Sequence, residues 1–91
     1  MQLEIVGRGL ELTEALRNQA QKKLAVLAKH GAGATAKLLL YVERNHQCAE
    51  LTLYLTGKTL RAEADAADMY QTFDLIVDKM KRQLVKYHEQ K

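Results

Sequence analysis

The sequence has no proline and no tryptophan, and it contains a single cysteine. The absence of proline is typical of a chain built from regular elements joined by short turns. A lone cysteine cannot form an internal disulfide, the usual brace of a small secreted domain. No apolar run approaches the roughly 20 residues that cross a bilayer, and the N-terminal residues lack the pattern of a secretory signal. We therefore expect a cytoplasmic protein with no membrane partner.

The remaining composition is that of a small folded domain with a basic surface. Hydrophobic residues make up 47% of the 91 residues, which is ordinary for a globular chain, so residues 1–91 are expected to form one domain. The formal net charge is +3 and the isoelectric point is near 9.1. This charge permits a polyanionic partner without requiring one.

Hydrophobic periodicity predicts the element order βαβββα, an α+β fold. Strands are predicted over residues 2–6, 36–44, 48–56 and 59–66, with turns at residues 45–47 and 57–58. One helix is predicted to follow the N-cap Thr13 and to end near residues 29–30, before Gly31 and Gly33. The other begins after the N-cap Asp68, with Gln71 placed to complete a capping box, and runs to residue 91.

A parallel pair across the first helix, followed by an antiparallel meander, gives a four-stranded mixed sheet with both helices packed on one face. The side chains expected to point toward the helices are Leu38, Leu40, Val42, Ala49, Leu51, Leu53, Leu55, Leu60, Ala62 and Ala64. The other face carries Leu39, Tyr41, Thr52 and Tyr54 among charged residues, and we expect it to face solvent.

Catalytic and metal-binding patterns are weak in this sequence. Cys48 has His46 nearby, but a lone cysteine without a glycine-rich elbow is more simply a half-exposed strand residue than a nucleophile. His30, His46 and His88 are scattered and lack metal-ligand spacing. We therefore predict no enzymatic activity, no small-molecule substrate, no cofactor and no metal.

Basic residues form the clearest candidate site. In the last helix Lys79, Arg82 and Lys86 recur at i, i+3 and i+7, opposite an apolar stripe that comprises Met69, Phe73, Ile76, Val77, Met80 and Leu84. In the first helix Lys22 and Lys29 lie opposite the apolar positions, and Arg17 and Lys23 flank them. If both helices cover one side of the sheet, these cations combine into a patch that suits the phosphate backbone of structured RNA.

Two other interpretations of the surface stay open. For one helix alone, a solvated charged face would be the simpler explanation. Tyr41 and Tyr54 could instead stack RNA bases, but the carboxylates of Glu43, Glu50 and Glu63 would repel phosphate, which favours a cross-strand structural role.

The sequence also resembles the ribosome hibernation-promoting factor family, which includes the ribosome-associated inhibitor A proteins. The segments that carry the resemblance are Met1-Gln2-Leu3-Glu4-Ile5, Leu12-Thr13-Glu14-Ala15-Leu16-Arg17, Lys22-Lys23-Leu24, Asp68-Met69-Tyr70 and the run from Asp78 to Lys86. The Asp-Met-Tyr cap, with the later Asp-Lys and Arg-Gln-Leu, is the most specific part.

This resemblance implies a fold similar to double-stranded-RNA-binding domains and a translation inhibitor active in stress or stationary phase. It implies binding to the small ribosomal subunit and its rRNA, in the channel used by mRNA and tRNA. The residues implied by position are Arg17, Lys23, Lys79, Arg82 and Lys86, to which the helix pattern adds Lys22 and Lys29. The alternative is a general structured-RNA-binding module without preference for the ribosome.

The sequence departs from the family pattern in two places. Residues 30–35 lack the aromatic residues that many members have after the first helix. Short members end near residue 91 and need a separate modulation factor to pair ribosomes, whereas long members continue into a second domain that pairs them. Both a short form and the N-terminal domain of a long form fit this sequence, so a modulation factor or a second copy stays open as a further partner.

Overall fold

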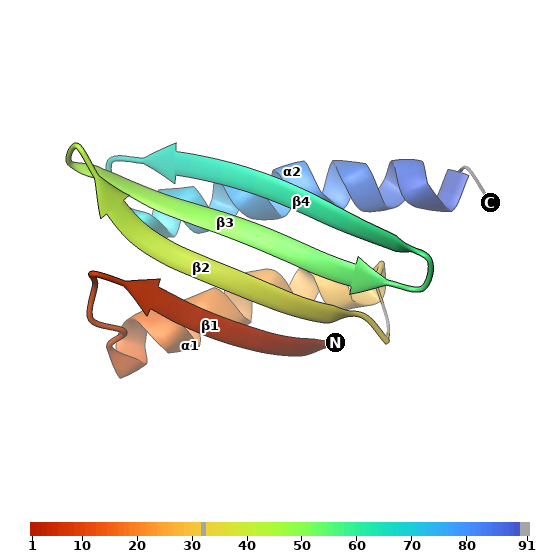
Figure 1. Ribbon diagram of the computed structural model, residues 1–91, viewed down its shortest axis with the longest axis horizontal. Helices are drawn as coiled ribbons and strands as arrows, with labels where there is room; N and C mark the ends of the chain where they lie inside the picture. The colour runs from red at the N-terminus through yellow and green to blue at the C-terminus, as the bar shows by residue number, and fades with distance from the viewer. Residues whose placement is uncertain (32, 90–91) are drawn as a thin grey trace.

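The computed structural model describes residues 1–31 and 33–89, which form a four-stranded sheet packed against two helices (Figure 1). In chain order the elements are β1 (Gln2–Arg8), α1 (Glu14–Leu24), the 3₁₀ helix η1 (Ala25–Lys29), β2 (Thr35–Glu43), β3 (His46–Leu55), β4 (Lys58–Ala66) and α2 (Met69–Glu89). The predicted order βαβββα is confirmed. The prediction that the last helix reaches residue 91 concerns residues 90 and 91, which lie outside the described part.

The sheet has the strand order β1-β2-β3-β4. The first two strands are parallel, with Ile5 opposite Leu38, and α1 and η1 connect them. β2, β3 and β4 follow as an antiparallel meander, as predicted. Figure 1 shows both helices behind the sheet, and α2 packs on β3 and β4. This arrangement leaves the other face of the sheet without a covering layer.

The core lies between the sheet and the helices, because apolar side chains alternate along each strand and recur along each helix. The largest side chains that are completely buried are Phe73, Leu24, Leu27, Leu38, Leu40, Leu51, Leu53, Ile76, Met80 and Leu84. Ala62 and Ala64 are buried on β4, where their small side chains allow α2 to approach the sheet. The predicted apolar stripe of the last helix therefore fixes the rotation of α2 about its axis.

Both predicted N-caps are present. The Thr13 hydroxyl accepts a hydrogen bond from the Leu16 amide at 3.1 Å, and the Asp68 carboxylate accepts one from the Gln71 amide at 3.0 Å. The first helix, predicted as one α-helix to residue 30, instead tightens into η1 after Leu24. Such tightening is common where helices end. No helix in the described part of the chain is both long enough and apolar enough to span a membrane.

The two hairpin turns lie earlier in the chain than predicted. Arg44 and Asn45 form the first turn with φ of 51° and 65°, so residues 46 and 47, predicted as part of the turn, belong to β3. A two-residue turn with two positive φ values matches the twist of the flanking strands. In the second turn Gly57 takes the positive φ of 78°, and Lys58 already pairs with Leu55 as the start of β4.

Val42 was predicted to be in the core, but its residue surface is 45% exposed. The pairing between β1 and β2 ends at Tyr41, so the sheet is only three strands wide beside Val42. Strand alternation correctly places Val42 on the same face as Leu38 and Leu40. The prediction fails because the packed core ends before the strand does.

Candidate RNA-binding surface

The seven predicted cations belong to α1, η1 and α2, which lie on the same side of the sheet. Their buried faces, Ala20 and Leu24 in α1 and Met80 and Leu84 in α2, point to the core, so the remaining positions face outward. Six of the cations are exposed and Lys23 is half-buried; the exposed ones are Arg17, Lys22, Lys29, Lys79, Arg82 and Lys86. The sequence pattern thus identified accessible cations on two adjacent elements.

Three of these cations have partners within the protein. The Lys23 ammonium lies 2.9 Å from the Asp74 carboxylate, which joins α1 to α2. Arg82 pairs with Asp78, one helical turn earlier, at 2.6 Å. The Lys79 ammonium donates to the backbone carbonyl of Glu63 at 2.7 Å. These contacts lie at the surface, so they restrain the side chains while leaving them within reach of an external anion.

The contact of Lys79 with β4 corrects the predicted position of the basic stripe. Gln83, one turn later, also reaches β4, because its side-chain amide donates to the Arg61 carbonyl at 2.6 Å. The stripe that starts at Lys79 therefore begins on the flank of α2 beside β4 rather than opposite the core. Asp74, by contrast, contacts α1. Lys23, which pairs with Asp74, and Lys79 therefore lie beside opposite flanks of α2.

The other four predicted cations are free to bind an anion. Within residues 1–31 and 33–89, Arg17, Lys22, Lys29 and Lys86 are in no ion pair and donate no side-chain hydrogen bond. An unpaired cation contributes its full charge to counterion release when it contacts a phosphate. Lys29 is the last residue of η1, and Lys86 lies in the last turn of α2.

The uncovered face of the sheet has the opposite electrostatic character. The pKa of Tyr41 is raised by burial and then by the nearby carboxylates of Glu50, Glu43 and Glu63. The guanidinium of Arg8 lies over the Tyr41 ring at 4.4 Å, so this aromatic face is already occupied. These contacts favour the structural role for Tyr41 over base stacking, and the acidic surroundings would repel an RNA backbone.

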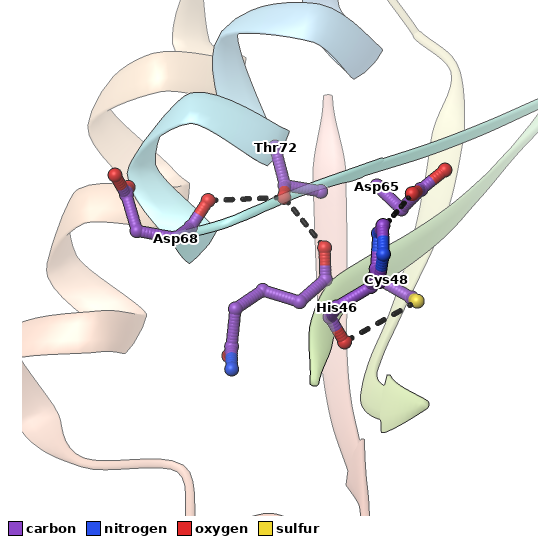
Figure 2. A network of polar contacts seen from close by, with 6 residues as sticks. His46, Cys48, Asp65, Asp68 and Thr72 are labelled. Atoms are coloured by element: carbon purple, nitrogen blue, oxygen red, sulfur yellow. Dashed lines mark hydrogen bonds and ion pairs between the residues drawn. The ribbon is translucent and has the colours of Figure 1, made fainter. Parts of the chain in front are cut away.

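Cys48 is buried, with 8% of its residue surface exposed, and not half-exposed as predicted. Its cross-strand neighbours are Tyr41 and Asp65, whose larger side chains flank the small thiol. Figure 2 shows the thiol directed at the backbone carbonyl of His46, 3.6 Å away, while the His46 ring contacts Asp65 at 2.7 Å. Burial, followed by the charge of Asp65, raises the pKa of the thiol. A protonated thiol without an imidazole partner is poorly suited to nucleophilic catalysis.

The structure adds two candidate residues that sequence reasoning missed. Lys58 and Arg61 of β4 line the same groove as Lys86 of α2. Strand alternation could have placed Lys58 on the helix side of β4, because it shares strand parity with the buried Leu60 and Ala62. Which helix residues lie beside it becomes clear only from the packing of α2 on β4.

Within the described part of the chain, no group of three metal-ligating side chains is placed to hold a metal ion.

Comparison with known proteins places this arrangement among ribosome-associated proteins. The family model described as "Sigma 54 modulation protein / S30EA ribosomal protein" matches residues 3–91. A ribosome hibernation promoting factor of Azotobacter vinelandii is 38% identical over 90 residues, covering 98% of this chain and 84% of that protein. The factor of the same name from Escherichia coli K12 is 36% identical over 90 residues, covering 98% and 95%.

Solved structures give the same result for the fold. The N-terminal domain of Thermus thermophilus Protein Y superposes with a TM-score of 0.87 and 32% identity, covering 96% of this chain and 99% of that one. A ribosomal subunit interface protein from Coxiella burnetii superposes with a TM-score of 0.88 and 27% identity, covering 98% and 99%. The similarity thus extends over the sheet and both helices.

Proposed function

The chain belongs to the Sigma 54 modulation protein / S30EA ribosomal protein family, and on this basis we propose that it is a ribosome-binding hibernation factor. The observation that carries the proposal is the match over nearly the whole chain to relatives named ribosome hibernation promoting factor. The exposed cations of α1 and α2 supply the means of binding, because rRNA presents phosphates at high charge density.

The proposed target is the small ribosomal subunit and its rRNA, in the channel that mRNA and tRNA use. Inhibition of translation would then be steric, because the domain occupies space that the substrates of translation need. A packed core that fixes the rotation of α2 supports this mechanism, since it holds the cations in place. The protein would act in the cytoplasm, under the conditions of stress or stationary phase in which ribosomes are idle.

The proposed contacts are phosphate contacts by Arg17, Lys22, Lys23, Lys29, Lys79, Arg82 and Lys86. They read backbone shape and position rather than base sequence. The preference for the ribosome over other structured RNA would come from the arrangement of α1 and α2 across the docking surface.

The test is cosedimentation with purified small subunits in sucrose gradients at low and high salt. The wild-type protein should sediment with the subunits at low salt, and excess unrelated structured RNA should not displace it. Charge reversal of Lys79, Arg82 and Lys86 to Glu should abolish cosedimentation, because attraction to phosphate becomes repulsion. Gradients run with whole ribosomes also detect ribosome dimers.

A matched control separates the proposed surface from net charge. The double variant Lys79→Glu/Lys86→Glu changes the charge by the same amount as Lys37→Glu/Arg44→Glu, whose residues lie on β2 and in the first hairpin turn. Only the first pair should lose binding, and circular dichroism should show that both variants are folded. Equal loss in both pairs, or none in the first, would contradict the proposal.

A further inference from the structure

A groove runs between the start of β4 and the last turns of α2. It has a volume of about 360 Å³ and is lined by Lys58, Thr59, Leu60, Arg61, Gln83, Lys86 and Tyr87. Three of these residues are cationic, and no acidic residue is among them. We refer to it as the β4–α2 groove.

The walls of the β4–α2 groove are held together by hydrogen bonds. The Gln83 amide donates to the Arg61 carbonyl at 2.6 Å, and the Tyr87 hydroxyl donates to the Thr56 carbonyl at 3.3 Å. Lys58 shares strand parity with the buried Leu60, so it lies on the helix side of β4, toward Lys86. The groove is therefore built from two elements of fixed relative position.

The cations of this groove are not neutralised within the protein. Across the part of the chain that the structure describes, Lys58, Arg61 and Lys86 form no side-chain ion pair. A groove on the uncovered face of the sheet differs, because Glu43 and Asp65 contribute to its lining. An anion in the β4–α2 groove would meet positive charge without a competing carboxylate in the lining.

The positive surface continues around the end of α2. A second groove is lined by Lys29, His30, Gly31, Gly33, Ala34, Leu55, Thr56, Tyr87 and His88, again without an acidic residue. The two grooves share Tyr87, with Lys29 in one and Lys86 in the other. The β4–α2 groove is thus continuous with cations already assigned to the RNA-binding surface.

We propose that the β4–α2 groove is an additional contact for the RNA phosphate backbone, in which Lys58 and Arg61 act together with Lys86. The inference rests on the proposed function and extends the binding surface from the helices onto the edge strand. Lys58 and Arg61 lie about 10 Å apart along β4, and their opposite strand parity directs Lys58 to the helix side and Arg61 to the uncovered side of this edge strand. Two charges placed in this way suit a polymer that passes along the strand edge better than a single phosphate ion.

The test compares Lys58→Gln with the matched control Lys37→Gln. Both lysines are exposed, lie on strands and are in no ion pair of the described residues, but Lys37 is on β2. Binding to purified small subunits is measured at 50 and 200 mM salt. Loss of one phosphate contact flattens the slope of log affinity against log salt by about 0.7–0.9. For Lys58→Gln the affinity ratio between the two salts should therefore shrink about threefold, with no change for Lys37→Gln.

The outcomes distinguish this inference from the proposed function. If the wild type binds subunits but both variants have the same salt slope, the groove contact is overturned and the proposed function stands. If the wild type binds unrelated structured RNA but not subunits, the proposed function fails. The salt slopes of the two variants on that RNA then decide whether the groove contacts phosphate. Binding to neither overturns both. Thermal unfolding of the two variants excludes loss of fold as the cause.

Discussion

Two carboxylates on α2 should weaken RNA binding by holding cations that phosphate would otherwise recruit. Asp74 pairs with Lys23 and Asp78 pairs with Arg82, and all four side chains are at least 40% exposed. The double substitution Asp74→Asn/Asp78→Asn removes both negative charges and keeps the size of the side chains. It should therefore produce a protein that binds the ribosome more tightly than the wild type.

The magnitude follows from the exposure of the two pairs. An exposed ion pair contributes about 0.2–1 kcal/mol, and that is the cost of releasing each cation to a phosphate. Removing the cost should tighten binding about 1.4- to 5-fold for each pair, since 1.4 kcal/mol corresponds to a factor of ten. Stability should fall by the same small free energy, which lowers Tm by no more than about 8 °C for each pair in a domain of this size.

The assay is a titration of small subunits at several salt concentrations, with Glu43→Gln/Glu63→Gln as the control. Glu43 and Glu63 are exposed carboxylates on the strands, so the control changes the net charge equally. If charge alone governs binding, both double variants will tighten it to the same extent. That equality, or weaker binding by Asp74→Asn/Asp78→Asn, would refute the role of these ion pairs.

Two further predictions concern the stability of the fold. Thr72→Val removes the buried hydroxyl that donates to the Gln47 carbonyl at 2.6 Å, seen in Figure 2, and should cost about 1–3 kcal/mol in urea unfolding; unchanged stability would show that this bond has no net value. The raised pKa of Cys48 means that the folded state retains the thiol proton more strongly than the unfolded chain. The contribution of this protonated thiol to the free energy of unfolding is fully present below the ordinary thiol pKa of about 8.5, and it is lost as the pH rises above that value. Wild-type stability should thus fall more steeply than that of Cys48→Ala between pH 8 and 10, and parallel pH curves would contradict this.

The sequence contains the elements of the fold because their determinants are local. The periodic spacing of Phe73, Ile76 and Met80 predicts both the helix and its buried face, and Thr13 and Asp68 mark helix starts through hydrogen bonds to nearby amides. Strand alternation likewise assigns the two faces of the sheet. These signals depend on neighbours within a few residues, so they can be read without knowledge of the fold.

The features that could not be predicted from the sequence depend on residues far apart along the chain. Cys48 is buried because the strand register places Tyr41 and Asp65 beside it. Val42 is exposed because β1 ends before it, and the alternation of residues within β2 does not indicate where β1 ends. The direction of the Lys79 side chain depends on which flank of α2 meets β4. The presence of exposed cations on the helices was therefore predictable, whereas the position of Lys79 on the flank of α2 beside β4 was not.

Lys79 illustrates how the core and the charged surface depend on each other. Its ammonium and the Gln83 amide both donate to outward-directed carbonyls of β4, an edge strand that would otherwise offer them to another chain. Burial of Met80 and Leu84 brings these polar neighbours to the strand, because the rotation of α2 is fixed by its apolar face. Lys79 thus protects the edge of the sheet and adds positive charge beside the β4–α2 groove. Because the same rotation places Lys86 in that groove, a change that turned α2 would disturb the core, the strand edge and the RNA-binding surface together.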